Sequence, residues 1–240
     1  MTKRWENPAE KNAFYLSKKV FAAIRDHNMV DEGDRILIGL SGGKDSLALM
    51  YLLGYMRRYS EVPYEVVLCH VAADAKGEIK VSPAIRKIME ESGLPYIIKE
   101  IDTTGEELPL TCARCARLRR KALFEAAKEA GCGKLALGHR LEDFAATALM
   151  NLFSSGRLET MAYRREYFGG ELTVIRPIAY LRETDVKTMT AAAGLEPVPS
   201  ECPLAGQTAR SESEDILAAA RKAFRGAAYN IVHASDVINE

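Results

Sequence analysis

The sequence of 240 residues has no long hydrophobic run and no excess of charge of either sign. No stretch approaches the roughly 18 to 20 consecutive apolar residues of a membrane span, and the charged N-terminus contains no apolar signal region. We therefore expect a cytoplasmic protein without a membrane partner. The 33 Lys and Arg residues balance 33 Asp and Glu residues, which excludes a protein that is strongly basic over its whole surface. Any surface that binds nucleic acid must be local.

Cysteine is scarce, and its number is odd, which argues against a disulfide scaffold. Three roles stay open for the five cysteines: metal ligation, redox chemistry and packing. Cys69 lies inside an apolar run typical of a strand, and Cys132 stands between two glycines after an expected helix. Because unpaired cysteines are among the most buried residues, we expect both to be structural.

The sequence does contain a repeated alternation of short apolar runs and amphipathic segments. It is 48% hydrophobic and 28% charged, which is ordinary for a globular protein. The alternation predicts an α/β fold in which a parallel sheet is covered by helices on both faces, with ligands at the carboxyl ends of the strands. Strands are expected at 35–40, 64–71, 96–101, 134–137 and 172–175, and helices at 45–57, 83–91, 112–130, 141–153 and 184–193.

Signals for helix ends stand near both termini. Asn7 followed by Pro8 predicts the start of a first helix. Ser211, with Glu214 three residues later, has the pattern of a capping box. Gly226 predicts the end of a last helix ahead of a polar tail.

A polar, glycine-rich turn at residues 41–46, Ser-Gly-Gly-Lys-Asp-Ser, joins the first expected strand to the next helix. Small residues let backbone N–H groups approach a phosphate there, and the helix N-terminus favours negative charge. A Walker A loop is excluded, because Ile38 stands where Gly is required and Asp45 where Ser or Thr is required. A turn without a ligand is the alternative, but reversing the chain does not require Lys, Asp and two Ser.

This turn resembles the pyrophosphate loop, SGGxDS, of enzymes that cleave ATP between its α and β phosphates and adenylate a carbonyl oxygen or a carboxylate. The resemblance implies that backbone N–H groups and a hydroxyl hold the pyrophosphate, that Lys44 neutralises its charge and that Asp45 assists with Mg²⁺. The residues implied to hold the phosphate are Ser41, Gly42, Gly43 and Ser46.

A C-x-x-C pair, Cys112 and Cys115, begins the fourth expected helix and places both thiols on one face. The helix N-terminus and neighbouring arginines favour thiolates. The pair is consistent with a redox pair, half of a zinc site or part of an iron–sulfur site. No second C-x-x-C completes a zinc site, but Cys202, on a loop after a proline-rich stretch, could supply a third thiolate to a [4Fe-4S] cluster.

Four ordered motifs cover most of the chain: 31–36, 111–120, 136–139 with 142, 143 and 147, and 174–180 with 182 and 183. Together with the loop and the cysteines, they resemble the tRNA 2-thiocytidine synthetase family (TtcA), a sister of the tRNA 2-thiouridine synthetases (TtuA), over about 21–210. The resemblance implies a Rossmann-like fold of the HUP type (adenine nucleotide alpha hydrolase-like). It also implies that ATP and Mg²⁺ serve to adenylate C2–O of a tRNA pyrimidine, cytidine 32.

The same resemblance implies that sulfur, delivered through a [4Fe-4S] cluster on Cys112, Cys115 and Cys202, replaces that oxygen. The expected partners are tRNA and a sulfur donor, either the persulfide of a cysteine desulfurase or sulfide, and a homodimer is expected. The chain departs from the family in three places. Arg140 stands where the family usually has a second His, Glu142 where it has Asp, and Ala205 where the second cysteine after Cys202 would be.

Further residues are implied to form the site. Gly138 and His139 follow an expected strand and should lie beside the nucleotide, although an ordinary capped loop histidine is the alternative. Asp143 begins the next helix, and the resemblance implies a catalytic or Mg²⁺ role, whereas a carboxylate there can simply favour the helix dipole. Arg119 shares a helical stripe with both cysteines and is implied to be catalytic, with a solvated cation as the alternative. Asp74 ends the second expected strand, where nucleotide contacts are common.

Positive charge is concentrated in one segment. Residues 112–165 contain eleven Lys or Arg against five Asp or Glu. This excess surrounds the cysteine helix and a loop expected after the fifth helix, which includes Arg164 and Arg165. We expect tRNA to bind here through phosphate contacts that weaken as salt rises, with a solvated helix face as the alternative.

We divide the chain into an N-terminal helix (1–30), a PP-loop ATP pyrophosphatase domain with the cysteine helix (31–180) and a helical C-terminal extension with the third cysteine (181–240). Two other functions stay open. One is a cluster-free adenylating enzyme or sulfurtransferase, such as a lysidine synthetase, an amide-forming ligase or a persulfide-carrying thiolase, that acts on another tRNA base or a small molecule. The other is a nucleotide-binding sensor without turnover. Iron content and pyrophosphate release separate these hypotheses.

Overall fold

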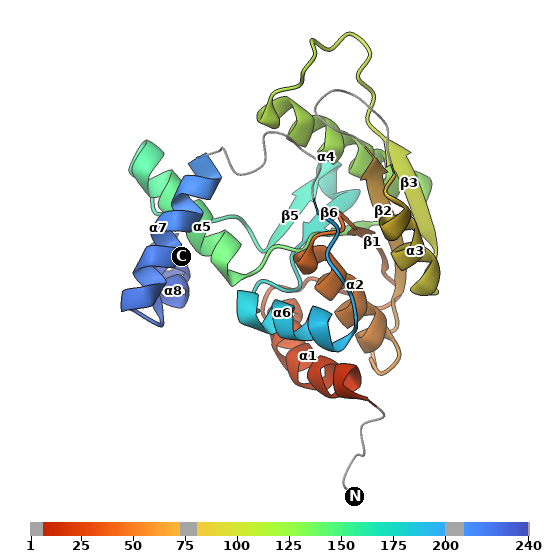
Figure 1. The fold of residues 1–240 in the computed structure, drawn as a ribbon, viewed down its shortest axis with the longest axis horizontal. Coiled ribbons are helices and arrows are strands. Elements are labelled where there is room, and N and C mark those ends of the chain that lie inside the picture. The colour runs from red at the N-terminus through yellow and green to blue at the C-terminus, as the bar shows by residue number, and fades with distance from the viewer. Residues whose placement is uncertain (1–6, 73–80, 200–208, 240) are drawn as a thin grey trace, which may run out of the picture.

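The computed structural model describes residues 7–72, 81–199 and 209–239 (Figure 1). Asp74, Cys202 and Ala205 lie outside these residues. In chain order the elements are α1 (Pro8–Asp26), β1 (Arg35–Gly39), α2 (Lys44–Arg57), β2 (Glu65–Ala72), α3 (Pro83–Glu91), β3 (Tyr96–Glu100), α4 (Cys112–Glu129), β4 (Lys134–Ala136), α5 (Leu141–Ser155), β5 (Arg164–Tyr167), the 3₁₀ turn η1 (Phe168–Gly170), β6 (Leu172–Ile175), α6 (Glu183–Ala192), α7 (Ala209–Ala223) and α8 (Ala227–Asn239).

The strands form one six-stranded sheet in the order β3-β2-β1-β4-β6-β5. Strands β1, β2, β3, β4 and β6 are parallel, as the alternation predicts. The strand order reverses beside β1, whose neighbours are β2 and β4, and ligands of such sheets bind in the crevice at this point. The loops that follow β1 and β4 therefore meet at the expected ligand edge.

One strand was not expected. Strand β5 pairs antiparallel with β6 at the edge of the sheet, so the prediction of a loop at Arg164 and Arg165 was wrong, since both lie on this strand. The segment reads Arg-Arg-Glu-Tyr and three of its residues are exposed. An edge strand of this kind has no apolar alternation that marks it in the sequence.

Helices cover both faces of the sheet, as predicted (Figure 1). Helices α1, α2 and α6 pack against one another, and their apolar side chains share a core with Ile36 and Ile38 of β1. On the other face, α4 packs over the sheet, where Ala126 and Ala127 contact a core that includes Leu37 of β1. Successive residues of β1 thus enter opposite cores, which is why the strand is apolar throughout.

The predicted helix end near the N-terminus of the chain is confirmed, whereas the predictions near the C-terminus differ from the structure. The Asn7 side chain accepts a hydrogen bond from the backbone N–H of Glu10 at 2.9 Å, which confirms the first helix cap. Helix α7 begins at Ala209, so the prediction of a capping box at Ser211 was wrong, because this residue already lies in the helix. Gly226 follows α7 as expected, but the segment beyond it is α8 and not a polar tail.

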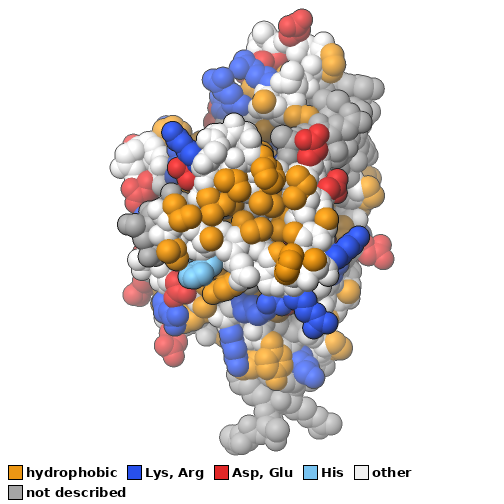
Figure 2. All heavy atoms as spheres, turned by 90° about the vertical axis from the view of Figure 1, so that its left-hand side faces the viewer, with side chains coloured by type: hydrophobic (Ala, Val, Ile, Leu, Met, Phe, Trp, Pro, Cys, Tyr) orange, Lys and Arg blue, Asp and Glu red, His pale blue; other side chains and the backbone are white. Residues whose placement is uncertain are grey.

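Helices α5, α7 and α8 pack together at the side of the molecule (Figure 1), around Phe144, Leu217 and Val232. On this side hydrophobic side chains gather over a broad part of the surface (Figure 2). None of the helices in the described ranges is long and apolar enough to span a membrane. Large apolar residues exposed on these three helices and in the turn between α7 and α8 are Leu152, Phe153, Ile216, Phe224, Tyr229, Val237 and Ile238.

Candidate active site

The glycine-rich turn closes on itself between β1 and α2. The Ser46 hydroxyl donates to the carbonyl of Gly43 at 2.9 Å, and the backbone N–H of Gly43 donates to the Ser41 hydroxyl at 3.3 Å. Gly42 has φ of +86°, and a Cβ there would come within 3.0 Å of the Ile85 side chain. Helix α2 begins at Lys44 and has no side-chain cap, so its first N–H groups point to the turn and are suited to bind an anion.

Gly138 allows the end of β4 to approach this turn. A Cβ at Gly138 would lie 3.0 Å from the backbone carbonyl of Asp45 and 3.0 Å from the backbone nitrogen of Ser46. Neither backbone atom can move without displacing the start of α2. The contact explains why glycine is needed after β4, and it places His139 beside the phosphate loop.

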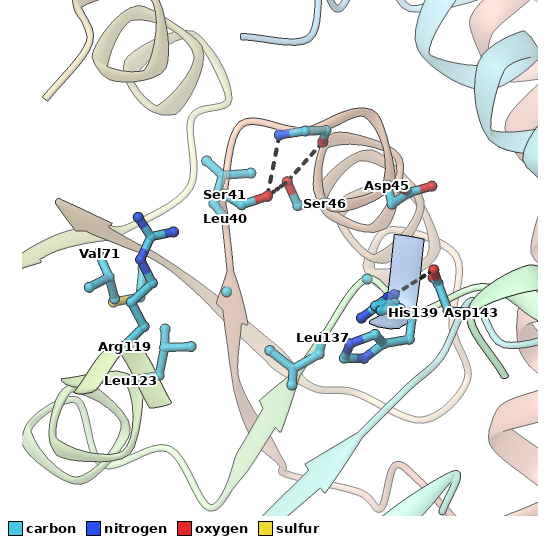
Figure 3. Close-up of a pocket in the computed structure, with 15 residues that line it drawn as sticks. Leu40, Ser41, Asp45, Ser46, Val71, Arg119, Leu123, Leu137, His139 and Asp143 are labelled. Carbon is cyan, nitrogen blue, oxygen red and sulfur yellow. Dashed lines mark hydrogen bonds and ion pairs between the residues drawn. The ribbon is translucent and has the colours of Figure 1, made fainter. Parts of the chain in front are cut away.

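A pocket of about 280 Å³ lies where these segments meet. The turn forms its upper edge, Arg119 and Leu123 of α4 lie on one side, and His139 and Asp143 lie on the opposite side (Figure 3). The pocket thus combines a phosphate-binding turn with the helix that carries the C-x-x-C pair. The predicted site residues that line it are Ser41, Gly43, Asp45, Ser46, Arg119, Gly138, His139 and Asp143.

Arg140 forms ion pairs with two carboxylates, one of which, Asp45, lies in the first turn of α2. Its guanidinium donates to Asp45 at 2.9 Å and to Glu142 at 2.6 Å. Glu142 is buried and also accepts the backbone N–H of Glu183 at 3.0 Å, while Lys44 lies 3.4 Å from Asp45. Buried charges are tolerated when they are paired in this way. The two departures from the family at 140 and 142 are therefore partners in one ion pair.

Asp143 makes one contact that caps α5 and a second contact with a residue that lines the pocket. One carboxylate oxygen accepts the backbone N–H of Arg140 at 2.8 Å, which caps α5 as the dipole alternative suggested. The other accepts from Arg210 at 2.7 Å, and Arg210 itself lines the pocket. Sequence reasoning missed Arg210 because it stands 67 residues away at the start of α7 and belongs to no motif.

His139 is neutral in this environment. Burial and the nearby charge of Arg176 lower the pKa of His139 to about 4. The Arg176 guanidinium donates to its Nδ1 at 3.3 Å and also to the backbone carbonyl of Ala162. The ring therefore accepts a hydrogen bond from a cation through Nδ1, and the residue also lines the pocket.

Helix α4 carries the cysteine pair at its N-terminal end. Thr111 caps the helix by accepting the backbone N–H of Arg114 at 3.3 Å. Cys112 is exposed and Cys115 is half-buried beside Leu118, and neither lines the pocket that Arg119 lines. The thiols therefore lie outside the pocket, on the same helix as the pocket residue Arg119.

Cys69 and Cys132 have the environments expected of structural cysteines. Both are buried, and burial raises the pKa of Cys69 to about 12 and raises the pKa of Cys132. Their thiols are protonated at neutral pH and are poor metal ligands. Within the described ranges, no three His, Cys, Asp or Glu side chains are placed to hold a metal ion, and the third predicted ligand, Cys202, lies outside those ranges.

A family model described as a PP-loop domain matches residues 15–199. The tRNA-cytidine(32) 2-sulfurtransferase of Syntrophotalea carbinolica is 40% identical over 78% of this chain and 74% of that protein. The protein of the same name from Neisseria meningitidis serogroup C is 38% identical over 78% of this chain, which spans only 60% of its relative. The solved U34-tRNA thiolase NcsA from Methanococcus maripaludis, with its [4Fe-4S] cluster, is similar with a TM-score of 0.76, 25% identity and coverage of 96% of this chain and 79% of that chain.

Proposed function

We propose, from the premise that this chain belongs to the PP-loop domain family and to the tRNA-cytidine(32) 2-sulfurtransferase family, that it replaces the C2 oxygen of a tRNA cytidine with sulfur. The observation that carries the proposal is the single pocket in which the phosphate loop faces Arg119 of the cysteine helix. A reaction that needs both an activated oxygen and a sulfur atom requires the ATP site and the thiols to lie close together.

The first half of the reaction uses ATP. The C2 oxygen attacks the α-phosphorus, the bond to the β-phosphate oxygen breaks, and pyrophosphate leaves. The N–H groups at the start of α2 would hold the pyrophosphate, together with the Ser46 hydroxyl once it turns from the Gly43 carbonyl, and Lys44 would balance the charge. Asp45 and Asp143 are the carboxylates that line the pocket, so they are the residues suited to a Mg²⁺ ion that accompanies ATP.

In the second half, sulfur attacks C2, the C2–O bond breaks, and AMP leaves with the original oxygen. Arg119 lines the pocket, and its cation would stabilise the negative charge that develops on the departing AMP. The neutral His139 ring is placed to hydrogen-bond the substrate base or the nucleotide without adding charge.

Two of the three proposed cluster ligands, Cys112 and Cys115, are among the described residues, and their chemistry fits the cluster. Cys112 and Cys115 are one helical turn apart and accessible, and the two buried cysteines are protonated. The described residues that flank the segment with Cys202 both reach the pocket region: the backbone N–H of Val198 donates to Gly42 at 3.0 Å, and Arg210 binds Asp143. A bound [4Fe-4S] cluster would supply sulfur to the activated base through its fourth iron.

The proposed partners follow from the reaction. They are a tRNA that presents cytidine 32 and a sulfur donor, either a cysteine desulfurase persulfide or sulfide. The homodimer stays a prediction, and the apolar surface over α5, α7 and α8 is of the kind that protein interfaces use (Figure 2). We also propose that the chain has three parts: an N-terminal helix (1–30), the PP-loop domain (31–180) and a helical C-terminal extension (181–240).

The test is a reaction of the anaerobically purified protein, after iron and sulfide analysis, with ATP, sulfide and unmodified tRNA. We expect 2-thiocytidine in the nucleoside digest, together with AMP and pyrophosphate in equal amounts. Mass spectrometry of tRNA from cells that lack the gene should show loss of the same nucleoside. Release of ADP and phosphate, or thiolation of a free pyrimidine as fast as tRNA, would contradict the proposal.

A further inference from the structure

A groove separate from the ATP pocket runs along α4. It has a volume of about 680 Å³ and lies between α4 and the turn η1 that joins β5 to β6. Arg119 and Leu123 of α4 line the ATP pocket, whereas the adjacent Arg120 and Phe124 line the groove. Neighbouring helix positions are about 100° apart, so one helix presents different faces to the two cavities.

The α4 side of the groove is basic. Arg117, Arg120, Lys121 and Lys128 line it and are exposed, and together they span about 16 Å along the helix axis. Within the described part of the chain, Arg117, Arg120 and Lys128 form no ion pair, and Lys121 has only an exposed pair with Glu125 at 3.8 Å. Glu125 and Glu171 also line the groove, so its four cations exceed its carboxylates by two, and an excess of this sign is suited to a chain of phosphates.

The opposite side of the groove presents an aromatic ring. Phe168 is 63% exposed and has φ of +54°, a conformation that bulky residues rarely adopt. Its ring contacts Phe124 edge to face, with 5.7 Å between the centroids. Such strain persists only where the surroundings hold it, and it tends to occur at binding sites. The turn thus holds an exposed ring beside the row of cations.

The groove leads toward the pocket through further cations. Arg120 and Arg165 lie close enough to Arg176 to act on its charge, and Arg176 donates to His139 in the pocket wall. Arg165 also lies over the ring of Tyr167 at 5.4 Å. Cations thus lie both in the groove and in the wall of the ATP pocket, which Arg176 contacts through His139.

We propose that this groove binds a single-stranded RNA segment next to the target base, with its phosphates on Arg117, Arg120 and Lys128 and one base stacked on Phe168. The inference rests on the proposed function and names the surface that recognises its substrate. Unstacked loop bases are commonly held on aromatic side chains beside basic residues, and an acidic protein partner would not require the exposed ring.

The experiment measures binding of unmodified tRNA by fluorescence anisotropy over a series of salt concentrations. The double variant Arg117→Ala, Lys128→Ala is compared with Arg86→Ala, Lys87→Ala, which removes the same two residue types from exposed positions of α3. We expect the groove variant to reduce the slope of log Kd against log salt by about 1.4, since each lost contact with a single strand contributes about 0.7. The α3 variant should keep the wild-type slope.

The aromatic contact is tested by Phe168→Ala, with Phe168→Tyr to keep the ring and Tyr59→Ala as a control at equal exposure of 63%. Phe168→Ala should weaken tRNA binding about tenfold, and Phe168→Tyr should restore it. None of these residues lines the ATP pocket, so ATP binding should not change.

Three outcomes separate the inference from the function on which it rests. If wild-type protein binds and thiolates tRNA but the groove variants bind it unchanged, the groove inference is wrong and the function stands. Groove variants that bind tRNA normally yet lose transfer from a protein sulfur donor would assign the groove to that donor, and would also overturn the inference. Failure of wild-type protein to bind tRNA at any salt concentration would overturn both.

Discussion

The guanidinium of Arg140 donates to the carboxylate of Asp45 at 2.9 Å, which links the residue before α5 to the phosphate loop 95 positions earlier in the chain. The same guanidinium holds buried Glu142. A Mg²⁺ ion at the loop would compete with Arg140 for the Asp45 carboxylate, and a polyphosphate there would compete with Asp45 for the Arg140 guanidinium. The contact therefore sets the position of Asp45 before ATP arrives.

Asp45→Asn should abolish most turnover while leaving the fold intact. The amide keeps the size of the side chain but removes the negative charge that balances Mg²⁺ and Lys44. We expect pyrophosphate release to fall by about 100-fold or more, with little change in the thermal midpoint. Glu90→Gln on the exposed part of α3 is the matched control. Wild-type rates in Asp45→Asn would remove this residue from the mechanism.

Cys112→Ala, Cys115→Ala and Cys202→Ala should each lose iron and thiolation activity together. Cys69→Ala and Cys132→Ala should keep the iron, because both thiols are buried and protonated. Iron and sulfide analysis of anaerobically purified variants, with the visible absorption of the cluster, gives the result. A full cluster in Cys202→Ala would show that three-cysteine ligation is wrong.

Much of the fold could be predicted from the sequence because its elements have strong local signals. Apolar runs such as that of β1 and the cap at Asn7 are confirmed. The edge strand β5 could not be predicted, since its residues are polar and its pairing depends on β6. At the site, the loop and Gly138 carry motifs, whereas the pairs Arg140 with Asp45 and Arg210 with Asp143 join distant segments that only the packed structure brings together.

The buried His139 should make the protein less stable in mild acid. Its pKa is about 4 in the folded protein and near 6.5 when unfolded, so the unfolded chain binds the proton more readily between these values. The stabilisation is fully present above about pH 6.5 and is lost as the pH falls toward 4, by at most about 3 kcal/mol. His70, whose pKa burial also lowers, contributes in the same direction.

Chemical denaturation between pH 4 and pH 7 measures this effect. In His139→Gln the free energy of unfolding should change less with pH than in the wild type, because the amide can still accept from Arg176 but does not titrate. His233→Gln, at an exposed position of α8, should retain the wild-type slope. Equal slopes in His139→Gln and the wild type would contradict a depressed pKa for His139.

Gly138→Ala should impair the ATP site more than it impairs the fold. The added methyl group would lie 3.0 Å from the Asp45 carbonyl and the Ser46 nitrogen, so β4 or the start of α2 must shift by several tenths of an ångström. A shift of this size misaligns the N–H groups proposed to hold the pyrophosphate, and a misplacement of about 1 Å at a reacting centre would cost about 100-fold in rate. Gly133→Ala is the matched control, since a Cβ there meets nothing within 4 Å and β4 begins at the next residue. Isothermal titration with a non-hydrolysable ATP analogue should show much weaker binding for Gly138→Ala and wild-type binding for Gly133→Ala, with both proteins folded by circular dichroism. If Gly138→Ala binds the analogue as tightly as the wild type, close approach of β4 to the phosphate loop does not shape the nucleotide site.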